Sequence, residues 1–129
     1  MINKALVLEE VIQAVEAVPA ERLSYGATVN SEGCLCAIGA YAYAKDPKFR
    51  RLADELYAKP EDMMPVGAIE VASTAYPLLT KQFADAIEGD RFVEAVYTVN
   101  DNAFHPRHGI SNPYVRKAEI LKRLREIEV

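Results

Sequence analysis

Two Asx-Pro dipeptides, Asp46-Pro47 and Asn112-Pro113, constrain the fold of this chain more than any other feature. An Asp or Asn side chain accepts hydrogen bonds from the free backbone N–H groups at a helix start, and proline fits the first helical position. Each dipeptide therefore predicts a helix that begins at its proline. The first of these helices is expected to cover residues 47–58.

Apolar residues recur at helical spacing beside these breaks. An N-terminal helix, capped by Asn3 and ended by Pro19, is predicted to bury Leu8, Val11, Ile12 and Val15. Residues 47–58 carry the stripe Phe49, Leu52, Ala53, Leu56 and Tyr57. The last helix is predicted to turn inward Ile120, Leu124 and Ile127.

Turn-forming residues punctuate the rest of the chain. Pro77 is predicted to open a helix, Gly89-Asp90 to stop it and cap the next one, and residues 103–112 to form a loop. The prediction is a mainly α, single compact domain over residues 1–129 with five or six short helices. The sequence also allows one small β-hairpin near residues 24–33.

Composition indicates an ordinary soluble globular chain. Of the 129 residues, 50% are hydrophobic and 26% are charged. No apolar run approaches the ~20 residues needed to span a bilayer, and the N-terminus lacks the apolar core of a signal peptide. We therefore expect a cytoplasmic protein that does not insert into membranes.

The charge is unevenly distributed along the chain. The net charge is −4, but residues 101–129 carry six Lys/Arg against four acids, so that segment is +2 and residues 1–100 are −6. Nucleic-acid binding needs a concentrated basic face that can contact phosphates. An acidic body of this kind argues against general nucleic-acid binding.

Cys34 and Cys36 stand at the start of a helix predicted over residues 34–45. Unpaired backbone N–H groups at a helix start favour a thiolate. On a helix, two residues spaced i and i+2 point about 200° apart, so we expect free thiols and no disulfide between them. Two cysteines are also too few for a four-thiolate zinc site.

The chain contains the residue types of a cysteine hydrolase, in which an oriented imidazole shuttles the proton of a thiol nucleophile. These types are supplied by Cys34 or Cys36, by His105 or His108, and by Asn100 or Asp101. His105-x-x-His108 also has a metal-ligand spacing, but Pro106 places it in a loop. We expect no metal and no cofactor, and we assign no catalytic residue.

A structural interpretation of the same residues is the preferred one. Cys36 is expected to be buried on the side of Ala37 and Ala40, and to be alkylated slowly. Asn100 or Asp101 is expected to bond the backbone locally, or to reach the start of the cysteine helix and cap it. The second possibility would tie two distant segments together.

Gly33-x-x-Cys36-Ala37-Ile38-Gly39-Ala40 and Val99-Asn100-Asp101-Asn102 together resemble a diffuse group of small, uncharacterised helical proteins of bacteriophages and actinobacteria. The resemblance covers roughly residues 24–128 and makes Cys36, Gly39, Asn100 and Asp101 the structural signature. The position before Asn-Asp, which is usually tryptophan or another hydrophobic residue in the group, is Val99 in this chain. The loop over residues 103–112 is longer than the resemblance leads us to expect. The resemblance implies a bacterial or phage origin, and bacterial or infected-host cytoplasm, but no activity.

The expected function is that of a small binding protein that occupies a macromolecular partner, most directly another protein. Tyr41 and Tyr43 lie on different faces of one predicted helix, and tyrosine is favoured at binding surfaces. Arg107, with Arg116 and Lys117, gives the loop end a positive field that would attract an acidic partner. His108, in the same loop, is a further candidate binding residue. The alternative is a thiol-dependent hydrolase or transferase that uses Cys34 or Cys36 with a histidine.

Overall fold

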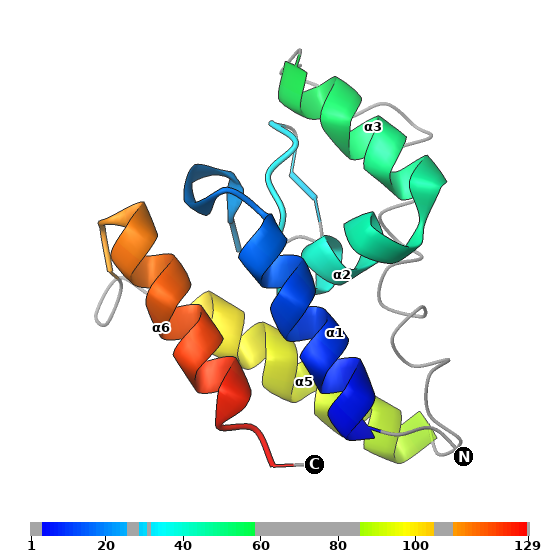
Figure 1. Ribbon diagram of the computed structural model, residues 1–129, viewed down its shortest axis with the longest axis vertical. Coiled ribbons are helices and arrows are strands. Elements are labelled where there is room, and N and C mark those ends of the chain that lie inside the picture. Colours follow the sequence, from blue (N-terminus) through cyan, green and yellow to red (C-terminus); the bar gives the residue numbers. More distant parts are fainter. Residues whose placement is uncertain (1–3, 26–28, 31, 59–85, 105–109, 129) are drawn as a thin grey trace.

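A computed structural model describes residues 4–25, 29–30, 32–58, 86–104 and 110–128 (Figure 1). These residues form five α-helices and one short 3-10 helix: α1 (Lys4–Ala17), η1 (Ala20–Arg22), α2 (Ala37–Lys45), α3 (Pro47–Ala58), α5 (Ala86–Asn102) and α6 (Pro113–Arg125). The prediction of a mainly α fold is confirmed. The predicted Asn3 cap and the predicted helix at Pro77 lie outside the described residues.

Both Asx-Pro dipeptides begin helices as predicted. The Asn112 side chain accepts hydrogen bonds from the backbone N–H groups of Tyr114 at 2.9 Å and Val115 at 3.2 Å. The Asp46 carboxylate accepts one from the N–H of Lys48 at 2.9 Å, and α3 begins at the next residue, Pro47. These caps fix the starts of α3 and α6 locally.

The core is built where α1 packs on α2 and α6, and where α5 packs on α2 and α6 (Figure 1). The predicted inward face of α1 is confirmed, because all four residues of its stripe are buried. The side chains with no exposed surface include Val11, Val15, Val96, Ile120 and Leu124. Ile127 lies beyond the end of α6 and is half-buried against this core.

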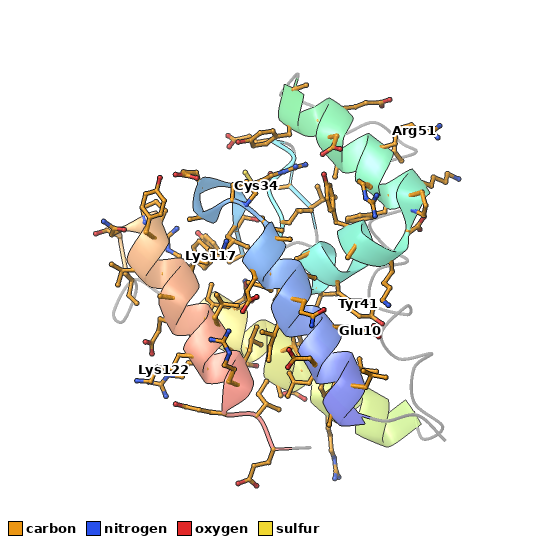
Figure 2. All side chains as sticks on the ribbon, viewed as in Figure 1. Glu10, Cys34, Tyr41, Arg51, Lys117 and Lys122 are labelled. Carbon is orange, nitrogen blue, oxygen red and sulfur yellow. The ribbon has the colours of Figure 1, made fainter. Side chains whose placement is uncertain are left out.

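Charged side chains hold α6 against the C-terminal end of α1. The Lys117 ammonium donates to the carbonyl oxygens of Glu16 and Val18, both at 2.7 Å, and thus caps that end of α1. Figure 2 shows Lys117 reaching from α6 toward α1. Arg125, about two helical turns further along α6, pairs with the Glu16 carboxylate.

Arg22 and Gly33 attach α3 to the rest of the molecule. Gly33 has φ +78°, and a Cβ atom there would lie 2.3 Å from the backbone nitrogen of Tyr57. The Arg22 guanidinium donates from Nε to the Gly33 carbonyl oxygen at 2.9 Å, and from Nη1 to Asp54 Oδ1 at 3.0 Å. Because Gly33 has no side chain, the loop before α2 can lie directly against the α3 backbone.

Two predictions of local structure differ from the fold. The predicted stop at Gly89-Asp90 is wrong, since α5 runs through both residues; a glycine costs an exposed helix only about 1 kcal/mol relative to alanine. In the described part of residues 24–33 no strand is present. Isolated bridges instead join Leu35 to Leu23 and to Val29.

We expect Gly33→Ala to lower the free energy of unfolding by about 2–4 kcal/mol, because the substitution adds left-handed backbone strain and a clash with Tyr57. Urea unfolding followed by circular dichroism measures the change. Glu32→Ala is the matched control at an exposed neighbour and is expected to stay within about 0.5 kcal/mol. A Gly33→Ala variant as stable as this control would contradict the close packing of loop and helix.

Candidate functional site

Cys36 is the N-cap of α2, not a residue within the helix. The structure begins α2 at Ala37, three residues later than predicted, and the Cys36 sulfur accepts a hydrogen bond from the Gly39 N–H at 3.4 Å. The side chain is buried, as expected, with 5% of its surface exposed. Cys36 therefore occupies the position that Ser, Thr, Asp or Asn takes in most helices.

Asn100 contacts the same helix start from α5. Its Oδ1 accepts a hydrogen bond from the Ala37 N–H at 3.1 Å, and its Nδ2 donates to the Ser24 carbonyl oxygen at 2.9 Å. Nδ2 also lies 3.1 Å from Asp101 Oδ1, which accepts its second hydrogen. We call Asn100 with these three partners the Asn100 junction.

The junction joins segments that are distant in sequence. Asn100 is 63 residues from Ala37 and 76 residues from Ser24, and its own side chain has no exposed surface. We predicted that Asn100 or Asp101 could reach the start of the cysteine helix, and Asn100 makes this contact through the Ala37 N–H. Asp101 contributes indirectly, by accepting from the Asn100 amide.

The expectation that the helix start favours a thiolate is wrong for both cysteines. Burial raises the pKa of the Cys36 thiol to about 11, although the N–H groups of Gly39 and Ile38 act in the opposite direction. Burial and the nearby Glu32 carboxylate raise the pKa of Cys34. Both thiols are therefore neutral near pH 7. Removal from water outweighs the helix N-terminus at Cys36, and it outweighs the Arg22 charge and the Asn30 hydrogen bond at Cys34.

The other predicted catalytic and metal-binding residues are only partly placed. His105, His108 and Arg107 lie outside the described residues. Among the residues that the structure describes, no three His, Cys, Asp or Glu side chains come close enough to hold a metal ion together. Within the same residues, none of the helices combines the length and the apolarity that a bilayer crossing requires.

Tyr41, predicted to be a binding residue, is buried in the described part of the chain. It has 2% of its surface exposed, because α2 is packed against α1, α3 and α5 on most of its circumference. Figure 2 shows Tyr41 near Glu10 of α1. Tyr43 is half-buried, and its hydroxyl donates to Asp54 Oδ1 at 2.8 Å.

Arg116, predicted to be a binding residue, is held by contacts within the chain. Its Nε donates to the Ile110 carbonyl oxygen at 2.8 Å, and its guanidinium lies 4.2 Å above the Phe104 ring. Replacing Arg116 would therefore disturb the end of the loop as well as remove a charge.

Sequence analysis missed Ser24, Tyr25 and Phe104. Ser24 takes part through its carbonyl oxygen, for which a side-chain pattern gives no signal. The Tyr25 and Phe104 rings stack with centroids 5.1 Å apart, although 79 positions separate them in the printed numbering. The sequence offers no signal that identifies Phe104 as the ring partner of Tyr25.

We expect Asn100→Ala to lower the free energy of unfolding by about 2–4 kcal/mol, since it leaves the Ala37 N–H and the Ser24 carbonyl buried without partners. Asp101→Ala is the matched control, and its cost should be smaller, about 0.5–2 kcal/mol, because Asp101 is half-buried and contributes to the junction through the Asn100 amide. Thermal and urea unfolding measure both. Equal costs would contradict the central place of Asn100.

Ionisation of the Cys36 thiol makes the free energy of unfolding depend on pH in the alkaline range. The thiol ionises near pH 8.5 when unfolded and near pH 11 when folded, so its contribution is complete below about pH 8.5 and is lost as pH rises toward 11. Urea unfolding across this range should show stability falling more steeply in the parent than in Cys36→Ala. Identical slopes would show that the Cys36 thiol is not buried as described.

Comparison with protein-family models, with curated proteins and with solved structures finds no match to this chain.

Proposed function

We propose that this chain is a non-catalytic binding protein that acts by occupying a protein partner. The thiol chemistry that the alternative requires is disfavoured by the raised pKa values of Cys34 and Cys36. The resemblance of the signature residues to phage and actinobacterial proteins suggests the setting, and it adds no activity. The proposal rests mainly on one exposed aromatic surface.

That surface lies where α6 begins beside η1 (Figure 1), and we call it the aromatic end. Its members are large side chains that remain accessible or stack on one another: Tyr25, Phe104, Tyr114, Val115 and Arg116. Tyr25, Tyr114 and Val115 expose 60%, 66% and 53% of their surfaces. Tyrosine and arginine are the residue types enriched among the energetically dominant residues of protein interfaces.

The aromatic end is held rigid before any partner arrives. The Arg116 guanidinium, the Phe104 ring and the Tyr25 ring form a continuous stack, and the Tyr114 hydroxyl donates to the Glu21 carboxylate. A preordered aromatic side chain loses little conformational entropy when it is buried in an interface. Exposed rings of this kind therefore favour binding.

Charge at this end favours an acidic partner. In their described hydrogen bonds, Arg116 and Lys117 both donate to backbone carbonyl oxygens, which are uncharged, and not to carboxylates. Their positive charge is not cancelled by those bonds. A positive field on an acidic protein steers an acidic surface toward this end and makes association depend on salt.

We expect a Tyr25→Ser, Val115→Ser double variant to lose at least about tenfold in partner affinity, because interface aromatic and aliphatic anchors contribute more than 1.4 kcal/mol together. Affinity capture from the native host identifies the partner, and surface plasmon resonance then measures affinity and its salt dependence. The melting temperature is expected to change little.

Tyr97→Ser is the matched control, since Tyr97 is an exposed tyrosine of α5 outside the aromatic end. It should bind like the parent. Unchanged partner binding by the double variant, or a loss of the same size in Tyr97→Ser, would contradict the assigned surface. Turnover of a substrate that depends on Cys34 would contradict the proposed function itself.

A further inference from the structure

A cavity of about 440 Å³ lies between α1, α2 and the start of α3. Small apolar side chains form much of its wall, among them Ala14, Ala40 and Ala44, and two arginines, Arg22 and Arg50, also line it. Its volume falls within the range of small-molecule sites, which combine apolar walls with a few polar groups. The cavity is separate from the aromatic end.

The described part of the chain leaves one guanidinium nitrogen of Arg22 without a hydrogen-bond acceptor. Only 7% of the residue is exposed, and its guanidinium lies 4.4 Å from the Tyr57 ring and 5.1 Å from the Tyr43 ring. Nε and Nη1 donate to Gly33 and Asp54, but Nη2 is buried and has no hydrogen-bond partner among the residues that the structure describes. A buried, unpaired donor is costly, and an incoming acceptor would remove that cost.

The charges around the cavity suit a ligand with one negative charge. The Asp54 carboxylate offsets the charge of Arg22 through an ion pair at 3.0 Å. Arg50 donates from Nε to the Tyr43 carbonyl oxygen and from Nη2 to the Ala44 carbonyl oxygen, so those bonds leave its charge uncompensated. The sum is close to one positive charge beside an apolar wall.

We infer that this cavity binds a monocarboxylic acid with a short apolar tail. One carboxylate oxygen accepts from Arg22 Nη2, Arg50 supplies the matching charge, and the tail packs against Ala14, Ala40 and Ala44. Arginine is well suited to this recognition because its planar guanidinium presents several donors to a carboxylate. Nη2 is covered in the free chain, so the side chains around the guanidinium, among them the Tyr43 and Tyr57 rings, must shift when the acid enters.

Titration of the ¹⁵N-labelled full chain with sodium hexanoate tests the inference. We expect saturable shifts of the Ala40 and Ala44 amides and of the Arg22 Nε–Hε signal. Hexan-1-ol has the same tail without the charge, and hexylamine has the opposite charge; both should bind at least about tenfold more weakly, the size expected for one charge-assisted hydrogen bond. Equal binding of hexanol and hexanoate would overturn the carboxylate assignment.

A cavity-filling variant tests the location without disturbing the Arg22 contacts. Ala44→Leu adds an aliphatic side chain at the cavity wall on a helix that accepts leucine well, and it should weaken hexanoate binding at least about tenfold. Ala118→Leu, at an exposed position of α6, is the matched control and should bind hexanoate like the parent. Unchanged binding to Ala44→Leu, or no saturable shift in the parent, would overturn the proposal.

The C-terminus of a polypeptide can also present a carboxylate beside an apolar side chain. An N-acetylated pentapeptide ending in leucine presents a carboxylate beside an apolar side chain, and its titration is read from the same signals. Tighter binding of this peptide than of hexanoate would assign the cavity to a chain terminus, and weaker binding would assign it to a free acid. Failure of both ligands would overturn the inference and leave the aromatic end unaffected.

Discussion

The buried carboxamide of Asn100 is the interaction on which the arrangement of the other elements depends. With one oxygen and one nitrogen it satisfies the Ala37 N–H at the start of α2 and the Ser24 carbonyl after η1. Both groups would otherwise be polar and buried without partners, at a cost of about 1–3 kcal/mol each. The helix α5 thereby fixes where α2 begins, and α2 in turn carries α3.

Because Asn100 bonds the start of α2, the cysteine motif has a structural role in the packing of this helix. Small residues in Cys-Ala-Ile-Gly-Ala let α2 lie among three other helices, while Cys36 caps the helix that it precedes. Burial then keeps the thiol protonated, so the same packing that orders the helix removes the nucleophile. The two binding sites that we propose, the aromatic end and the cavity beside Arg22, accordingly use residues other than the four of the structural signature.

Most local features of the fold were predictable, whereas most long-range contacts were not. The caps at Asp46 and Asn112 act within three residues of themselves, so the sequence pattern was sufficient to predict them. The burial of Tyr41 depends on three helices that surround α2, and helix periodicity of that segment alone cannot reveal it. The contact of Asn100 was foreseen as one possibility, but its second partner, a backbone carbonyl at Ser24, carries no side-chain signal.

Hydrogen exchange of the Ala37 amide tests the central claim most directly. The first backbone amide of a helix usually faces water, so its hydrogen exchanges quickly. Here that amide, of Ala37, donates to the buried Asn100 carboxamide. We predict that its protection in the native chain lies within about tenfold of that of the Val96 amide in the core of α5, which corresponds to about 1.4 kcal/mol. Exchange of Ala37 as fast as that of an exposed amide would contradict the Asn100 junction.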